Sequence, residues 1–272
     1  MKNTYQLKIP KELEQYRSNL EESVKPYIKM FGTQAETTFF ESKFGGFPYL
    51  PIKDEHPKDS AGQHMMLLAQ LNFEEIPHIE FMPNKGLLQL FISAEDELFG
   101  ADFDQPAIQK DFRIIYHPEI TQDLTEIVTD FSYLNTLNLE DFIIPEAAKL
   151  TFELGYQPVT TRDYRFEEIF KDKIDLEEEI IDGENEIELG ELYDDYFEGQ
   201  GHKIGGYPFF TQTDPREWEE KYREHNVLLL QIDTDDTLNI MWGDSGVANF
   251  FIRMEDLVNL DFSNVIYNWD CY

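Results

Sequence analysis

The chain contains two similar segments, and this internal repeat limits its possible folds more than any other feature. When the sequence is aligned with itself so that Lys43 matches Lys203, residues 43–49 (KFGGFPY) match residues 203–209 (KIGGYPF). Three further blocks follow in the same order, with one residue of slippage and one deletion: 67–72 over 228–233, 86–92 over 246–252, and 114–116 over 265–267. A period of this length is too long for a solenoid, so we expect two copies of one module.

Each copy predicts short strands joined by turns. It consists of a Gly-Gly-aromatic-Pro turn, a hydrophobic strand, a turn, a second strand and a short acidic helix. The apolar runs are short and end at Gly, Asn, Asp or Pro, which is typical of strands. Because turns rather than regular crossover helices connect them, we expect an α+β fold with a large, mainly antiparallel sheet and flanking helices. The two copies would bury their hydrophobic faces together as one pseudo-symmetric domain covering residues 1–272.

We place copy one at about residues 37–120, copy two at about 199–272, and an acidic connector between them at about 172–198. The connector holds 13 Asp and Glu and a single Lys, Lys173, but also apolar residues at intervals. We expect an amphipathic segment with its charges outward; the alternative is an acidic surface that attracts a basic protein or cations. Apolar spacing from Leu13 to Ile28 predicts a helix before copy one. Asp214 followed by Pro215 predicts the start of another.

Composition excludes several classes of protein. With 41% hydrophobic residues the chain can build a packed core, although 22 Lys and Arg against 55 Asp and Glu give a net charge of −33. A sequence pI near 4.3 argues against nucleic acid as a direct partner. The single cysteine, Cys271, permits no intramolecular disulfide. Apolar runs are far shorter than the roughly 18 residues of a membrane span, and the first residues lack a secretion signal, so we expect a cytoplasmic protein that contacts no membrane.

The repeated motifs resemble those of one bacterial family. They are GGFP at 45–48, the strands ending at Gln70 and Gln231, GLLQ at 86–89, and WGDSG at 242–246 leading into NFFI at 249–252. Together they are similar to the YwqG-like family of proteins of unknown function, from about residue 30 to the end. The resemblance implies a soluble bacterial cytoplasmic protein with a mixed α+β fold around a large, largely antiparallel sheet. It implies no activity and no catalytic residues.

One motif invites an enzymatic interpretation. The sequence GDSG at 243–246 is typical of the nucleophile region of chymotrypsin-like proteases. Such a serine needs a histidine base within hydrogen-bond reach, and no histidine here lies in a protease-like motif. In the other copy the equivalent residues are NKG at 84–86, so Lys85 stands in the place of Ser245. We therefore interpret both segments as turns that lead into a strand.

Metal and phosphate motifs are incomplete. The run 233–237 (DTDDT) begins like an EF-hand loop, but Leu238 stands where that loop needs Gly, and Ile187 stands at the same place after Asp182. A weak cation site of another kind stays an alternative. The histidines lack the spacing of a zinc site, and the Gly pairs at 45–46 and 205–206 fit no phosphate-binding pattern. We expect no metal and no cofactor.

Polar residues inside hydrophobic strands are the candidates for a binding site. Four amides occupy such positions, two in each copy: Gln70, Gln89, Gln231 and Asn249. A buried amide is costly without hydrogen-bond partners, so these side chains either clamp neighbouring turns across the pseudo-twofold or line a shared groove. In the groove, three further residues would contact a ligand: Asp233, Trp242 and Asp244.

These observations favour a non-enzymatic binding protein, because no catalytic set of residues withstands inspection. The negative charge favours a basic protein as partner, for example a toxin or nuclease that this chain would neutralise. The alternative is a small-ligand-binding protein or an enzyme with its site in the groove between the two copies. A third interpretation is that the acidity serves solubility. The oligomeric state is left open.

Overall fold

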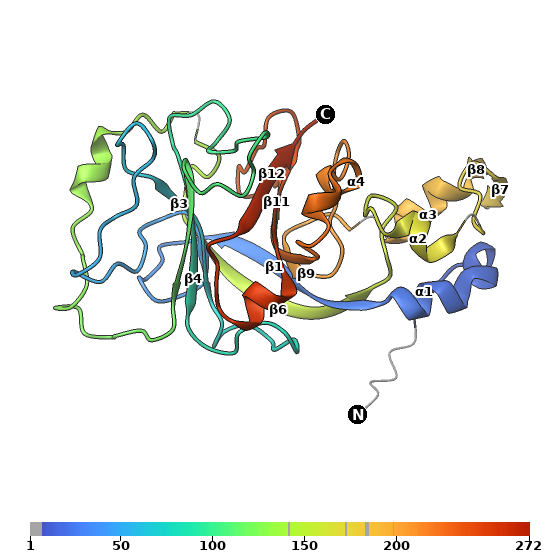
Figure 1. Ribbon diagram of the computed structural model, residues 1–272, viewed down its shortest axis with the longest axis horizontal. Coiled ribbons are helices and arrows are strands. Elements are labelled where there is room, and N and C mark those ends of the chain that lie inside the picture. Colours follow the sequence, from blue (N-terminus) through green and yellow to red (C-terminus); the bar gives the residue numbers. More distant parts are fainter. Residues whose placement is uncertain (1–6, 141, 172, 183–184, 198) are drawn as a thin grey trace.

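Two long strands form the middle of the sheet (Figure 1). β1 (Lys25–Gln34) and β6 (Ala148–Gln157) run antiparallel over their whole length. Both strands lie outside the two predicted copies, which therefore omit the centre of the sheet. The computed structural model describes residues 7–140, 142–171, 173–182, 185–197 and 199–272.

Four strands continue the sheet on each side of this pair. Beside β6 lies the first half, made of β2 (Lys43–Phe44), β3 (Met66–Asn72), β4 (Leu87–Ile92) and β5 (Phe112–His117). Beside β1 lies the second half, made of β9 (Lys203–Gly205), β10 (Val227–Asp233), β11 (Val247–Ile252) and β12 (Val265–Asp270). The strand order is β12-β11-β10-β9-β1-β6-β2-β3-β4-β5, and every pairing between these strands is antiparallel. The predicted antiparallel sheet is confirmed.

The two halves match in register. Lys43 pairs with Gln70, as Lys203 pairs with Gln231, and both β3 and β10 have a register shift at their third residue. In the last strands the register corrects the sequence alignment: Phe112 lies opposite residue 92 and Val265 opposite residue 252, so these two positions correspond. The predicted match of 114–116 with 265–267 is two residues out of step. A shift of two keeps every side chain on the same face, so the apolar pattern does not detect it.

One face of each half contributes to a shared core. Leu71 and Leu90 of the first half belong to the same buried cluster as Ile232 and Phe250 of the second. Smaller buried clusters lie on the opposite face, one of them around Phe251. The sheet curls so that its two halves enclose the main core (Figure 1).

Three short helices and a hairpin gather at one end of the molecule (Figure 1). They are α1 (Arg17–Ser23), α2 (Phe166–Phe170), α3 (Leu189–Phe197), β7 (Glu179–Asp182) and β8 (Asn185–Glu188). Their apolar side chains, including Leu20, Phe170 and Tyr193, form a second buried cluster. The predicted acidic connector is therefore folded, although its residues 172, 183–184 and 198 lie outside the described residues. Within the described ranges, no helix has the length and apolar character needed to cross a bilayer.

The remaining helices are single turns or little more. They are η1 (Lys11–Tyr16), η2 (Ser132–Thr136), α4 (Pro215–Trp218), η3 (Glu220–Tyr222) and α5 (Met254–Val258). The predicted start at Asp214 is confirmed, because its side chain accepts a hydrogen bond from the Arg216 N–H. The helix predicted to reach Ile28 instead ends at Ser23, and Ile28 lies in β1. Pro26 explains this difference, since the residue before a proline disfavours helical backbone.

Candidate functional site

The predicted amides form two separate clusters, one in each half. In the first half Gln70 and Gln89 lie opposite each other on β3 and β4, and both are buried. Gln70 Oε1 accepts hydrogen bonds from the Tyr49 N–H and from Gln89 Nε2, each at 2.9 Å. Gln70 Nε2 donates to the carbonyls of Phe39 and Glu41, both at 2.9 Å. All four bonds of the Gln70 amide are thus made inside the protein.

The second half repeats this arrangement. Gln231 Oε1 accepts from the Phe209 N–H at 2.8 Å, and its Nε2 donates to the carbonyls of Gly199 and Gly201 at 3.0 and 2.8 Å. Asn249 Nδ2 donates to the Phe209 carbonyl at 2.8 Å. Each cluster fastens loops of its own half. The predicted clamp between the two copies is not found among the described residues, because β1 and β6 separate the halves and no bond of either cluster crosses them.

The other three predicted residues lie in different surroundings. Asp233 is beside the second amide cluster, since its Oδ2 accepts from the Gly201 N–H at 2.6 Å. Trp242 is completely buried in the main core. Asp244 is exposed in the turn before β11, next to Ser245, whose φ of 60° is left-handed turn backbone. The seven predicted contacts are therefore spread over two clusters, the core and a surface turn.

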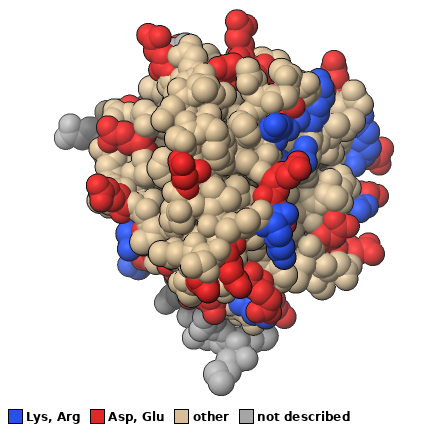
Figure 2. Space-filling model, turned by 90° about the vertical axis from the view of Figure 1, so that its left-hand side faces the viewer, with Lys and Arg blue, Asp and Glu red and all other residues tan. Residues whose placement is uncertain are grey.

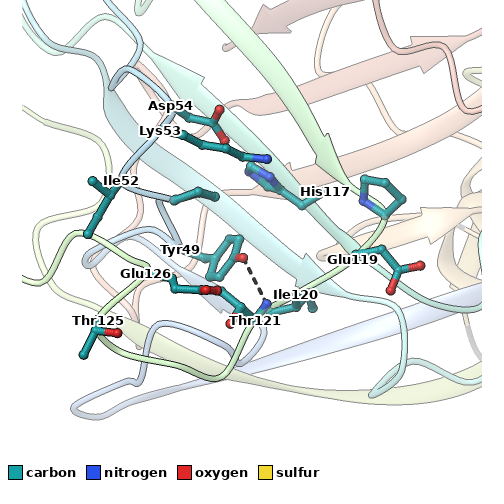
Figure 3. Close-up of a pocket in the computed structure, with 12 residues that line it drawn as sticks. Tyr49, Ile52, Lys53, Asp54, His117, Glu119, Ile120, Thr121, Thr125 and Glu126 are labelled. Carbon is teal, nitrogen blue, oxygen red and sulfur yellow. Dashed lines mark hydrogen bonds between the residues drawn. The ribbon is translucent and has the colours of Figure 1, made fainter.

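A pocket of about 1040 Å³ opens on the first half, beside the end of β5 (Figure 3). Three segments line it: residues 49–54 after β2, residues 117–121 at the end of β5, and residues 125–126. The turn motif at 45–48 places Tyr49 here, and the amides of Gln70 and Gln89 hold its backbone. The pocket thus lies directly beside the first amide cluster.

Gln89 fixes the imidazole of His117. Gln89 Oε1 lies 3.0 Å from His117 Nε2, and Gln89 Nε2 donates to the Tyr49 carbonyl at 2.7 Å. Because the Gln89 oxygen must be the acceptor, the hydrogen-bond network assigns the proton of His117 to Nε2. Nδ1 has no hydrogen-bond partner in the described part of the chain and is not among its buried unpartnered atoms. Its lone pair is therefore accessible at the pocket.

Tyr49 supplies the complementary group. Its ring lies edge-to-face against that of His117, with centroids 5.1 Å apart. Its hydroxyl oxygen accepts from the Thr121 N–H at 3.1 Å (Figure 3), and its own proton has no acceptor among the described residues. The pocket can therefore offer one hydrogen-bond donor beside one acceptor.

Burial keeps His117 neutral, and the charges at the mouth oppose each other. Burial lowers the pKa of His117 below its ordinary value; the nearby Asp54 opposes this change, and Lys53 adds to it. Figure 3 shows Lys53 and Asp54 on the same side of the pocket as the imidazole. Glu119 is exposed at the rim and pairs with Lys85 at 2.8 Å. At neutral pH the imidazole thus accepts at Nδ1 rather than donating.

The matching position in the second half is closed by Asp270. This residue pairs with residue 247 as His117 pairs with residue 87, so the two occupy equivalent places. The Asp270 carboxylate accepts from the N–H groups of Thr211 and Gln212 at 3.1 and 3.0 Å. These bonds hold the loop at residues 211–212, which follows the second Gly-Gly-aromatic-Pro turn, against the end of β12.

The first-half loop makes different bonds. In the place of Thr211 it has Pro51, which has no N–H, and in the place of Gln212 it has Ile52, whose N–H donates to the Glu126 carbonyl at 2.9 Å. A bridge between Pro51 and residue 127 continues this pairing. Residues 126–127 therefore hold the loop, and the end of β5 does not. The pocket lies between this loop and the end of β5.

Neither Tyr49 nor His117 was among the predicted contacts. A sequence signal existed for Tyr49, because it stands over Phe209 in the repeat and so adds a hydroxyl that the second copy lacks. His117 had no such signal, since the alignment two residues out of step did not place it over Asp270. Only the strand register revealed the difference.

Metal ligands do not gather in the described part of the chain. No group of three or more His, Cys, Asp and Glu there is close enough to hold an ion. In the EF-hand-like run, Asp235 Oδ1 accepts from the Thr237 N–H at 2.8 Å, and its Oδ2 lies 3.3 Å from His202 Nε2. These contacts are those of a turn.

The fold and the pocket define a protein built on one large antiparallel sheet with two matching halves, one of which is open beside His117. The family model described as "Domain of unknown function (DUF1963)" matches residues 42–271. The chain belongs to this family. No curated protein matches it.

Proposed function

We propose that this protein binds a small organic ligand in the pocket between Tyr49 and His117. The observation that supports the proposal is the pairing of an accessible imidazole lone pair with a hydroxyl that has a free proton. Ligand sites commonly combine apolar walls with a few fixed polar groups of this kind. The second half lacks both groups, since Phe209 and Asp270 stand in their places.

The lining indicates the chemistry of the ligand. Pro51, Ile52 and Ile120 supply apolar wall. Asp54 and Glu126 bring negative charge to the mouth, and Lys53 brings one positive charge. Nδ1 of His117 needs a donor, which an amine or a ring N–H provides. The ligand is therefore a small, partly apolar molecule with a nitrogen that donates a hydrogen bond, cationic or neutral.

A thermal-shift screen with amines and nitrogen heterocycles tests this proposal, followed by calorimetry on the hits. Tyr49→Phe removes one oxygen atom and gives the residue that the matching position already carries. Because the Thr121 N–H loses its acceptor, we expect this variant to lose about 1 kcal/mol of stability but to stay folded. It should bind the hits about fivefold to tenfold more weakly, as loss of one buried hydrogen bond does. His117→Gln should weaken the same hits.

Tyr196→Phe is the matched control, because Tyr196 is exposed on α3, away from the pocket. It should bind every hit as the wild type does. The proposal fails if no compound binds, or if the compounds that bind are insensitive to both Tyr49→Phe and His117→Gln.

A second candidate function, binding of a basic protein, is favoured by the hairpin β7–β8 and the residues beside it. Among the residues that the structure describes there, five glutamates are exposed: Glu177, Glu178, Glu179, Glu186 and Glu188. Within the described part of the chain none of the five forms an ion pair. On the face of the first half, by contrast, Lys and Arg side chains gather along one side (Figure 2). The end of the molecule with the hairpin is therefore the better place for a basic partner.

A tagged pull-down from bacterial lysate tests this candidate. One near-stoichiometric basic protein should be captured at low salt and lost at high salt, because the Debye length falls from about 10 Å at 0.1 M to about 3 Å at 1 M. Replacing the five glutamates by Gln should abolish capture. Capture that is unchanged by salt or by these replacements would contradict the candidate.

We also propose that the two halves are copies of one module, that the chain belongs to the YwqG-like group, and that it acts in the bacterial cytoplasm. The matching registers and amide clusters support the first point. If the halves are equivalent, Asn249→Gln, which copies the residue at position 89, should leave the free energy of unfolding within about 0.5 kcal/mol of the wild type, whereas Asn249→Leu should lower it clearly.

A further inference from the structure

A second hollow, which we call the aromatic cleft, lies where the two halves of the chain meet. It has a volume of about 500 Å³ and is lined by Phe103 from the loop between β4 and β5, Trp218 from α4, and Trp269 and Asp270 from β12. β12 is an outer strand of the sheet, so the cleft lies at a sheet edge. None of the residues predicted from the sequence as ligand contacts lines it.

The polar groups of the tryptophans in the cleft are already bonded. The indole N–H of Trp218 already donates to Thr213 Oγ1 at 3.3 Å, and that of Trp269 donates to the Leu98 carbonyl at 2.9 Å. The rings of Phe103 and Trp269 lie 6.2 Å apart and fix each other. Trp218 is nevertheless 71% exposed and Phe103 49%. Trp269 is packed against Phe99 and Trp242. With the indole N–H groups bonded, the exposed aromatic surfaces of Trp218 and Phe103 are what the cleft offers to a partner.

Acidic residues flank these aromatic residues in the sequence. Each aromatic residue has carboxylates as its neighbours in the chain: Asp102, Asp104, Glu217, Glu219 and Asp270. Two bases offset part of this charge, since Lys221 Nζ lies 3.4 Å from Glu219 and Arg162 acts on Asp270. Arg216, the base next to Trp218's flanking Glu217, is completely buried against Asp214 and takes no part. Ring faces and carboxylates attract the same kind of group, a cation.

We infer that the aromatic cleft binds an arginine or lysine side chain of a basic polypeptide. A guanidinium or ammonium placed over Trp218 would gain the cation–π interaction, and the further positive residues of the same polypeptide would meet the flanking carboxylates. A free small cation would gain the cation–π interaction only. The inference rests on the second candidate function, and it adds a contact point for the basic partner that is separate from the glutamates beside the hairpin.

Isothermal titration calorimetry with defined peptides tests the inference. The probe is a nine-residue Gly-Ser peptide with three arginines, and its neutral control carries citrulline in their place. Trp218→Ala is the main variant, because it leaves the net charge unchanged and removes a side chain that is 71% exposed, so the fold should persist. Tyr196→Ala, which removes an exposed aromatic ring from α3, is the matched control.

We expect the arginine peptide to bind the wild type and Tyr196→Ala equally, and to bind Trp218→Ala at least about fivefold more weakly. The citrulline peptide should not bind. Equal binding by Trp218→Ala would contradict binding in the aromatic cleft. It would leave a basic partner that is attracted by the overall negative charge alone. Equal binding of the citrulline peptide, or binding of acetyl-arginine amide as tight as that of the peptide, would also overturn the inference. If the arginine peptide does not bind at low salt, the inference about the aromatic cleft is wrong, even if the pull-down captures a basic protein.

Discussion

His117 and Asp270 occupy matching positions in the two halves of the sheet, but only Asp270 bonds the backbone of the neighbouring loop. Asp270 accepts two backbone hydrogen bonds from that loop, at 3.1 and 3.0 Å, and closes it against β12. His117 makes no such bond: its Nε2 is bonded to Gln89 at 3.0 Å, and its Nδ1 is left accessible. The change of side chain at this position, together with Pro51 and the bond from Ile52 to Glu126, separates an open half from a closed one.

This relationship predicts that Asp270 is a structural residue. Asp270→Ala leaves the N–H groups of Thr211 and Gln212 without their partner, so the free energy of unfolding should fall by about 2 kcal/mol. Urea unfolding at pH 7 measures the change. Asp244→Ala is the control, because Asp244 is exposed in a nearby turn, and it should cost less than about 0.5 kcal/mol. Equal effects of the two variants would contradict the assignment.

The buried amides predict a large loss of stability when they are removed. Gln70→Leu leaves the Tyr49 N–H and two carbonyls unpaired beneath the loops, and Gln231→Leu does the same to the Phe209 N–H. Each variant should lower the free energy of unfolding by about 3 kcal/mol. Gln63→Leu, at an exposed position, is the control for urea unfolding. A stable Gln70→Leu protein would favour a recognition role for the amide instead.

A buried ion cluster beside α4 makes a third prediction. Arg216 is completely buried and lies 2.7 Å from Asp214 and 3.3 Å from Asp163. Burial opposes ionisation of Asp163, but hydrogen bonds and charge from Arg165 and Arg216 outweigh it and hold its pKa below the ordinary value. Asp163→Asn leaves a buried positive charge uncompensated, so stability should fall by about 3 kcal/mol. Asp104→Asn, at an exposed position, should show almost no change in the same unfolding measurement.

The same cluster makes stability depend on pH through Lys25. Burial lowers the pKa of Lys25 to about 7, and the charges of Arg165 and Arg216 add to this change. The unfolded chain holds this proton up to about pH 10.4, so between pH 7 and that value the unfolded state binds more protons. Stability therefore rises with pH in this window, by about 1–2 kcal/mol from pH 7 to pH 9.

Lys25→Met should remove this rise. Lys29→Met is its control, because Lys29 is exposed on the same strand. Urea unfolding of the three proteins at pH 7, 8 and 9 compares them. If the slope of Lys25→Met equals that of the wild type, another group titrates in this range.

The sequence by itself determined the local features of this protein. The repeated Gly-Gly turns, the short apolar runs and the amides at 70 and 231 were predictable, because each depends on residues close together in the chain. The residues of the turns are also confirmed in conformation: Gly45 and Gly46 have φ values of 61° and 70°, and Gly205 and Gly206 of 72° and 70°. Such backbone favours glycine whatever packs around it.

The tertiary structure alone decided the centre of the sheet and the pocket. β1 and β6 carry no repeated motif, and they pair across more than 100 residues of chain. The pocket depends on how Tyr49, His117 and Glu126 meet, and that follows from strand register and from the loop bond at Ile52. A period-two pattern fixes the face of a strand but not its register to the nearest two residues. Contacts between segments far apart in the sequence therefore could not be predicted from it and are defined only by the tertiary structure.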